Sequence, residues 1–210
     1  MNGLKVGRIH AFCGPMFSGK TTRLTGLIEE EEIAKQFDEQ RTFLVINSAN
    51  DTRYGKNCIS THSGKKIPSY FLENSEEIYE LYQRSKPLNA AYIDEAMFFD
   101  SGLVGAVRRM AHEGTDVYLS FLNLTSEGEP FPFTDRKDHV GALLAIANSI
   151  ERSQAICSKT GRKHATMTHY KHGEKKDSHL VGAAESYQAL NLDSWHELNT
   201  HNIPDRLKNL

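Results

Sequence analysis

Gly14-Pro15-Met16-Phe17-Ser18-Gly19-Lys20-Thr21 matches the pattern G-x-x-x-x-G-K-[S/T] at every fixed position. The apolar segment Arg8–Cys13 before it predicts a strand, and the periodic segment Thr21–Phe37 after it predicts a helix. In this context the glycines let backbone N–H groups converge on phosphate oxygens at the helix N-terminus. Lys20 then reaches the β- and γ-phosphates, and the Thr21 hydroxyl binds Mg²⁺. The stretch therefore predicts a nucleoside triphosphate site rather than a glycine turn before an ordinary helix.

A second signal is the apolar segment Ala90–Ile93, a predicted strand that ends at Asp94 and Glu95. In proteins with a phosphate-binding loop, an acid at a strand end holds Mg²⁺ directly or through water, and Asp94 suits that role. Because adjacent strand residues point to opposite sides, Glu95 is expected to have a different task. It either polarises a water, as in ATPases, or accepts a proton from a substrate hydroxyl, as in kinases. The alternative is a pair of solvated loop acids, which the upstream glycine-rich stretch disfavours.

A third signal follows the predicted strand Thr42–Ile46, where the chain continues as Asp51-Thr52-Arg53-Tyr54. An arginine near a strand end can stabilise charge on a transferring phosphoryl group. A structural pair of Asp51 with Arg53 in a turn is the alternative, and spacing alone favours it.

The remaining chain alternates strands with helical patterns, which predicts a parallel sheet with crossover helices. Asn50–Pro68 predicts a loop or hairpin, Thr125–Asp138 a long surface loop, and the acidic run Glu29–Glu32 a solvated helix face. Beyond about Glu151 the composition turns to His, Lys, Ser and Thr, which places a domain boundary between 1–150 and 151–210. The other predicted elements are helices at Glu76–Arg84, Leu103–His112 and Val140–Ile150 and a strand at Asp116–Leu122.

Composition excludes several classes of protein. The 210 residues suit one domain, or one domain with a small appendage. Lys plus Arg number 25 against 27 for Asp plus Glu, a net charge of −2, which disfavours a nucleic-acid partner. No apolar run approaches the ~20 residues of a membrane span, and no signal-peptide core is expected. Cys13, Cys58 and Cys157 lie far apart, so we expect no disulfide framework and a cytoplasmic location.

Together these motifs resemble the type II thymidine kinases, compact P-loop nucleoside kinases that are unrelated in fold to the larger thymidine kinases. The Pro-Met-Phe filling of Gly14–Thr21 resembles that family's phosphate loop, and Asp51–Tyr54 resembles its signature after the second strand. Ile93–Phe99 resembles its D-E-x-Q-F-F segment, and Val181–Tyr187 resembles the I-G-G-x-x-x-Y element of its thymidine-binding lasso. The resemblance runs from about residue 8 to 196 of the chain.

The resemblance implies an α/β fold, a P-loop NTPase core with a RecA-like parallel sheet at 1–150, and a small lasso domain with a degenerate zinc ribbon at 151–210. It implies transfer of the γ-phosphoryl group of ATP to the 5′-hydroxyl of thymidine in nucleoside salvage, by a homotetramer, with Glu95 as general base and Arg53 stabilising the transferring group. The nucleotide and Mg²⁺ site would comprise Gly14, Pro15, Met16, Phe17, Ser18, Gly19, Lys20, Thr21, Asp51, Thr52, Arg53 and Asp94. The thymidine site would comprise Met16, Phe98, Leu122, Ser126, Thr168, Ser178, His179, Leu180, Val181, Gly182 and Tyr187.

Two departures from the family pattern concern the substrate. Met97 stands where glutamine is usual, and Ser126 stands where an aromatic residue covers the substrate. A deoxynucleoside kinase with another base preference therefore remains an alternative. A non-catalytic nucleotide-binding regulator and an ATPase that activates water through Glu95 are two others.

A third departure concerns zinc. The family's lasso domain commonly holds one Zn²⁺ with four ligands, a C-x-x-C pair and a second pair shortly after the lasso tyrosine. Here the corresponding pairs are Cys157 with Thr160 and Asn191 with Ser194. One thiolate cannot make a structural zinc site, so we expect no zinc and a lasso held by packing and oligomer contacts. A metal site rebuilt from nearby histidines is the alternative; these are His164, His169, His172 and His179.

Overall fold

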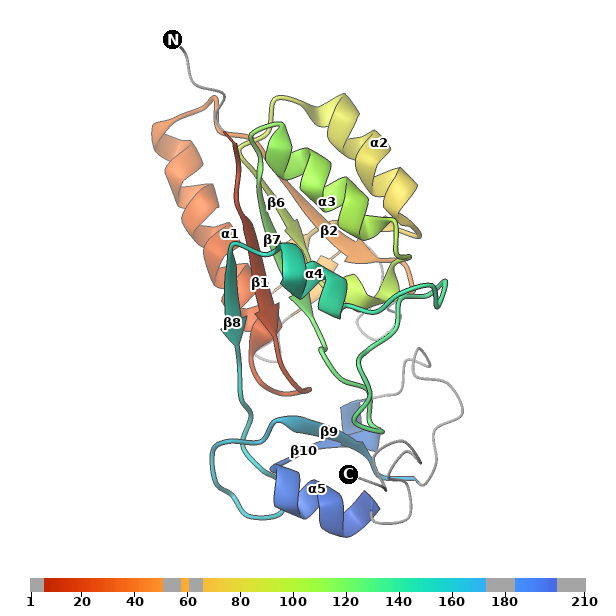
Figure 1. The fold of residues 1–210 in the computed structure, drawn as a ribbon. Helices are drawn as coiled ribbons and strands as arrows, with labels where there is room; N and C mark the ends of the chain where they lie inside the picture. Colours follow the sequence, from red (N-terminus) through yellow and green to blue (C-terminus); the bar gives the residue numbers. More distant parts are fainter. Residues whose placement is uncertain (1–5, 51–57, 61–65, 173–183, 200–210) are drawn as a thin grey trace.

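The computed structural model describes residues 6–50, 58–60, 66–172 and 184–199. Figure 1 shows a sheet between helices and, beyond the carboxyl ends of its strands, a smaller unit. The first part contains β1 Ile9–Cys13, α1 Lys20–Phe37, β2 Phe43–Ser48, β3 Cys58–Ser60, β4 Lys66–Pro68, β5 Tyr70–Leu72, α2 Ser75–Ser85, β6 Ala90–Ile93, η1 Ala96–Phe98, α3 Leu103–His112, β7 Asp116–Phe121, α4 Gly141–Ile146 and β8 Ser149–Arg152. The second contains β9 Met167–Tyr170, η2 Ala184–Ser186, β10 Tyr187–Leu190 and α5 Leu192–Asn199.

Six strands form the main sheet in the order β5-β2-β6-β7-β1-β8. Every neighbouring pair is parallel, so all the strands end at the same edge. All four residues of β6 are buried, as expected for a strand covered on both faces. The predicted α/β fold with a parallel sheet is therefore confirmed.

Two apolar layers cover the sheet. One contains buried residues of α2, α3 and α4 packed on the odd-numbered residues of β1, such as Ala11. The other packs Leu24 and Ile28 of α1, with the β3–β4 hairpin, on residues such as Phe12. This alternation along β1 follows from the two-residue period of a strand. Burial on both sides fixes the sheet as the frame of the molecule.

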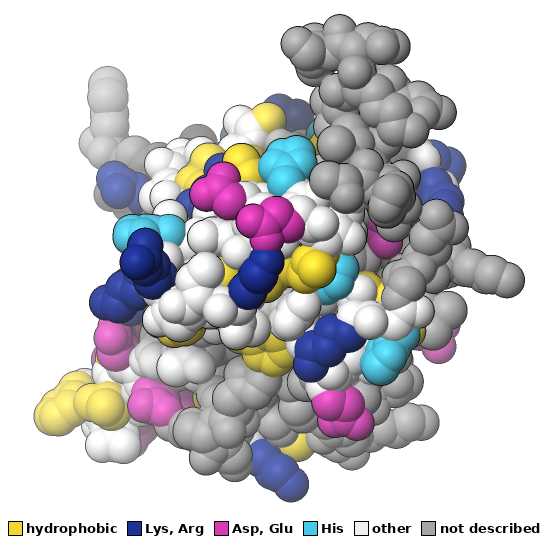
Figure 2. All heavy atoms as spheres, turned by 90° about the horizontal axis from the view of Figure 1, so that it is seen from below, with side chains coloured by type: hydrophobic (Ala, Val, Ile, Leu, Met, Phe, Trp, Pro, Cys, Tyr) yellow, Lys and Arg dark blue, Asp and Glu magenta, His cyan; other side chains and the backbone are white. Residues whose placement is uncertain are grey.

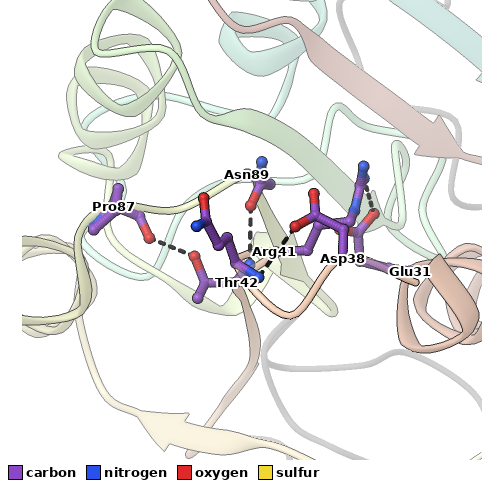
Figure 3. A network of polar contacts seen from close by, with 7 residues as sticks. Glu31, Asp38, Arg41, Thr42, Pro87 and Asn89 are labelled. Atoms are coloured by element: carbon purple, nitrogen blue, oxygen red, sulfur yellow. Dashed lines mark hydrogen bonds and ion pairs between the residues drawn. The ribbon is translucent and has the colours of Figure 1, made fainter. Parts of the chain in front are cut away.

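A polar network joins the end of α1 to the sheet (Figure 3). Arg41 donates to both carboxylate oxygens of Glu31 at 2.8 Å, and Glu31 is only 8% exposed. The backbone N–H of Thr42 donates to Asn89 Oδ1 at 2.9 Å, just before β6. The prediction of a solvated face for the whole run 29–32 was therefore wrong at Glu31, because a bidentate arginine compensates its burial.

The segment Val140–Ile150 does not form one helix. α4 ends at Ile146, and β8 then runs parallel to β1 at the sheet edge. Asn148 causes the change, because its side chain accepts from the Ile9 N–H at 2.7 Å and its own N–H donates to the Ile9 oxygen at 2.8 Å. The predicted boundary near residue 150 stays a prediction, while the sheet itself extends to Arg152.

Other differences from the expected elements are smaller. The short strand β5 was not predicted, and it extends the sheet beside β2. The expected loop or hairpin before Pro68 contains the antiparallel pair β3–β4. No helix among the described residues is long and apolar enough to cross a membrane.

The small unit, residues 153–172 and 184–199, has its own apolar cluster. β9 and β10 pair antiparallel, and α5 packs against both. Buried members of the cluster include Cys157, Met167, Leu190 and Trp195. In the described part of this unit, α5 thus covers the β9–β10 pair. The lasso residues predicted at 178–182 lie outside the described residues.

Substitution of Gly7 or Gly26 by alanine should change the free energy of unfolding in opposite directions. A Cβ at Gly7 would lie 2.1 Å from the Thr115 carbonyl oxygen, so we expect Gly7→Ala to lower the free energy of unfolding by about 1–3 kcal/mol. A Cβ at Gly26, within α1, would meet no atom within 4 Å apart from the adjacent backbone of its own helix. Gly26→Ala should therefore raise the free energy of unfolding by roughly 0.5–1 kcal/mol through helix propensity. Urea denaturation measures both, and equal stability of the two variants would contradict the packing described.

Candidate active site

The segment between β1 and α1 is a tightly curled loop. Gly14 has φ 151° and Phe17 φ 64°. A Cβ at Gly14 would lie 2.3 Å from the Ser153 carbonyl oxygen, so only glycine fits there. Inside the loop the Ser18 hydroxyl donates to the Pro15 oxygen at 2.8 Å. The loop thereby opens directly into the N-terminus of α1, where backbone N–H groups lack intrahelical acceptors.

Lys20 places a positive charge against this loop. Its ammonium group donates to the Pro15 oxygen at 2.7 Å and to Ser18 Oγ at 3.4 Å, and the residue is 8% exposed. Burial raises the pKa of the Cys13 thiol at the end of β1, and the charges of Arg152 and Lys20 oppose that rise. A buried cation beside the first N–H groups of a helix is the chemistry expected of an anion site.

Thr21 and Asp94 meet at the carboxyl edge of the sheet. The Thr21 hydroxyl donates to Asp94 Oδ1 at 3.4 Å, and Asp94 is 2% exposed. The Asp94 N–H donates to the Ile46 oxygen at 2.9 Å, which continues the pairing of β6 with β2. A hydroxyl and a carboxylate are the hard oxygen ligands that Mg²⁺ prefers, so this donor pair fits a magnesium ion.

Glu95 leaves the strand in a left-handed conformation. Its φ is 51°, and its N–H donates to Asp94 Oδ1 at 3.0 Å. Such a backbone is unfavourable by about 1–3 kcal/mol for a non-glycine residue and is typical of functional positions. Glu95 is partly exposed whereas Asp94 is buried. The different surroundings expected for the two acids thus arise from this turn, not from alternation along β6.

The small unit reaches the loop through Thr168 on β9. Thr168 Oγ1 accepts from the Met16 N–H at 3.0 Å, and both residues are buried. Tyr187 on β10 packs against Tyr170, with ring centroids 5.3 Å apart. Two other residues were predicted for the thymidine site: Phe98 belongs to the main apolar core, and Leu122 is partly buried and packs against it.

Ser126 is held by a residue that the sequence prediction missed. Its carbonyl oxygen accepts from Trp195 Nε1 at 3.0 Å, and its hydroxyl donates to Glu127 at 2.7 Å. Trp195 is the single tryptophan of the chain, which is the one sequence signal that marks it. Met97, the other departure from the family pattern, is fully buried in the main core.

The structure thus brings together the loop Gly14–Thr21, Asp94, Glu95 and Thr168. Eight other predicted site residues lie outside the described residues; they are Asp51, Thr52, Arg53, Ser178, His179, Leu180, Val181 and Gly182.

A strand, a glycine-bounded loop and a helix that carries lysine and threonine, facing a strand-end aspartate, define a P-loop nucleotide-binding protein. A family model described as thymidine kinase matches residues 7–194. The chain belongs to the thymidine kinase family.

Two relatives match over nearly the whole chain. The thymidine kinase of Pseudothermotoga lettingae is 29% identical over 196 residues, which cover 93% of this chain and 98% of the relative. The thymidine kinase of Mycoplasmoides gallisepticum is 32% identical over 207 residues, which cover 97% of this chain and 87% of the relative. Among solved structures, the Legionella pneumophila ATPase DotB superposes with a TM-score of 0.44 at 18% identity, over 76% of this chain and 43% of DotB.

The Thr168 contact predicts a measurable coupling. Thr168→Val leaves the buried Met16 N–H without its acceptor, and we expect a loss of about 1–3 kcal/mol in the free energy of unfolding. We also expect weaker binding of ATP, because the phosphate loop loses the hydrogen bond that holds Met16 in place. Thr168→Ser keeps the oxygen and serves as control. Calorimetric titration with ATP and thermal denaturation measure both effects; a valine variant that matches the serine variant would contradict the role of this contact.

Proposed function

We propose that this protein is an ATP-dependent thymidine kinase, which transfers the γ-phosphoryl group of ATP to the 5′-hydroxyl of thymidine. The products are ADP and thymidine 5′-monophosphate. Membership of the family supports this activity. The observation that carries it is the Thr21–Asp94 contact beside the Lys20 loop, since both parts of a phosphoryl-transfer site are present.

In this proposal the loop Gly14–Thr21 binds the phosphates of ATP through backbone N–H groups and Lys20. Thr21 and Asp94 would hold Mg²⁺, whose bound charge neutralises the phosphate oxygens. Asp51 and Thr52 complete the nucleotide site by the family resemblance.

Glu95 is the proposed general base. Its carboxylate takes the proton of the 5′-hydroxyl as the new oxygen–phosphorus bond forms and the bond from the γ-phosphorus to the ADP oxygen breaks. The partial exposure of Glu95 next to buried Asp94 supports this division of labour, because a base must meet the acceptor while a metal ligand need not. Arg53 is proposed to stabilise charge on the transferring group.

For thymidine, we propose a site between the phosphate loop and the small unit. The hydrogen bond between Met16 and Thr168 supports this location, because it brings a residue of the predicted base site onto the loop. The other proposed members are Phe98, Leu122, Ser126, Ser178, His179, Leu180, Val181, Gly182 and Tyr187.

The wider setting is also proposed. We infer a cytoplasmic homotetramer that acts on a small-molecule substrate, with no nucleic-acid or membrane partner. The net charge of −2 supports the absence of a nucleic-acid partner. A domain boundary near residue 150 separates the nucleotide-binding part from the lasso.

A second candidate is a deoxynucleoside kinase with a different base preference. Ser126 favours it, because this small buried residue stands where the family resemblance places an aromatic ring over the base. Its contact with Trp195 holds it at that position. The phosphoryl-transfer chemistry is the same for both candidates.

Release of ADP from Mg-ATP by the purified protein distinguishes the candidates. We expect release that depends on thymidine, with thymidine monophosphate as product. Release that depends on deoxyuridine or deoxycytidine instead would assign another base preference. Release without any acceptor would identify an ATPase, and no release under any condition would identify a nucleotide-binding regulator.

Glu95→Gln tests the proposed base. We expect turnover to fall by about 10²–10⁴-fold with ATP affinity unchanged, since the amide is similar in shape but accepts no proton. Glu76→Gln, at an exposed position of α2, is the matched control and should retain full turnover. Initial rates with calorimetric ATP binding measure both. A Glu95→Gln variant as fast as the control would remove Glu95 from the mechanism.

A further inference from the structure

Two turns of the small unit meet at one buried point. The first is Cys157–Thr160, and the second is Asn191–Ser194, at the start of α5. The Cys157 sulfur lies 3.9 Å from Ser194 Oγ, and both residues are buried. Each turn carries its outer residues at the x-x spacing typical of paired zinc ligands. The two turns thus bring Cys157 next to Ser194, one residue from each spaced pair.

Cys157 and Asn191 form hydrogen bonds where the two turns meet. Burial raises the pKa of the Cys157 thiol, but hydrogen bonds from the Thr160 hydroxyl and from the N–H groups of Asn191, Thr160 and Lys159 outweigh burial and lower it to about 6. These donors come from both turns, and the Cys157 thiol itself donates to Ser194 Oγ at 3.9 Å, so the sulfur forms hydrogen bonds across the junction. Asn191 Oδ1 in turn accepts from the Ser194 N–H at 2.9 Å. The side-chain oxygen of Asn191 is therefore used to begin the helix.

This donor set does not fit zinc. Zinc binds thiolates, imidazoles and carboxylates, whereas Cys157 is accompanied here by two neutral hydroxyls and one amide. Nearby histidines have other partners: His164 contacts Gln154 at 2.8 Å, and His169 contacts Asn199 at 3.0 Å. Among the described residues, no group of three or more His, Cys, Asp or Glu side chains is placed to hold a metal ion.

Backbone hydrogen bonds and an ion pair also stabilise these two turns. The Gly161 N–H donates to the Cys157 oxygen at 2.8 Å, and the Ser158 N–H donates to the Ala189 oxygen at 2.8 Å. Lys159 forms an ion pair with Glu197 of α5. Figure 2 views this end of the molecule and shows basic and acidic side chains intermixed on its surface. The junction therefore has backbone, side-chain and ionic contacts of its own.

We propose that hydrogen bonds among Cys157, Thr160, Asn191 and Ser194 close the small unit without a metal ion, at positions that still converge as a zinc site would. The inference goes beyond the kinase activity, since it concerns how the unit that presents Thr168 to the phosphate loop is held. It holds whichever substrate the protein phosphorylates.

The wild-type full chain, purified from zinc-supplemented medium, provides the first test. We expect substoichiometric zinc by atomic emission, and a melting temperature unchanged by a zinc-selective chelator. One zinc ion per chain, or a fall in melting temperature on chelation, would overturn the proposal. These readouts are independent of kinase turnover, so they stay informative if the proposed function is wrong.

A variant that restores three thiols tests the convergence of the four positions. Thr160→Cys, Asn191→Cys and Ser194→Cys together should bind one zinc ion, give the absorption spectrum of tetrahedral thiolates with Co²⁺, and melt at a lower temperature after chelation. The same variant with Cys157→Ser added is the matched control and should bind zinc more weakly. A folded triple variant that binds no metal would overturn the proposal.

Two single substitutions test the hydrogen bonds without relying on the triple variant to fold. Cys157→Ser keeps an acceptor at the junction, whereas Cys157→Ala keeps only an apolar group. We expect both to melt below the wild type and the serine variant to melt above the alanine variant. The reverse order would show that Cys157 acts as a small hydrophobic residue, and it would overturn the proposal.

Discussion

The parallel pairing of β1 with strands on both sides is the constraint on which the site depends. Held between β7 and β8, β1 delivers the chain to Gly14 at a fixed point on the carboxyl edge. The glycine loop can then curl against Ser153, which directly follows β8, and turn into α1. The same edge carries Asp94 at the end of β6. The phosphate loop, the start of α1 and Asp94 therefore meet because the parallel strands that carry them end at the same edge of the sheet.

The polar groups of the site form hydrogen bonds with one another. Lys20 donates to the loop that it serves, and Asp94 accepts from Thr21 and from the Glu95 backbone. A buried charge without such partners would be unfavourable by several kcal/mol, so these contacts make the site compatible with a stable fold. They also keep the groups close to the positions in which phosphate and Mg²⁺ need them, which reduces reorganisation on binding.

The sequence predicted best where one local pattern decides the structure. The glycine loop, its flanking strand and helix, and the acids after Ile93 follow from motif and periodicity, and the structure has them there. The predicted helix Val140–Ile150 was wrong at its C-terminal end, because a short apolar run suits a helix or a strand equally. The contact of Asn148 with Ile9, which is distant in the sequence, favours the strand. Trp195 was missed for a similar reason, since its partner Ser126 is defined only by the tertiary fold.

The contact between Met16 and Thr168 spans 152 residues of chain. During synthesis on the ribosome, β1 and the loop after it emerge before β9, the strand that carries Thr168. The nascent chain therefore lacks this contact while those 152 residues are made, and Thr168 can reach Met16 only after β9 has left the exit tunnel. Contacts of such long range are also those that form slowly. Termination of translation before β9 would therefore leave the phosphate loop without the hydrogen bond from Met16 to Thr168.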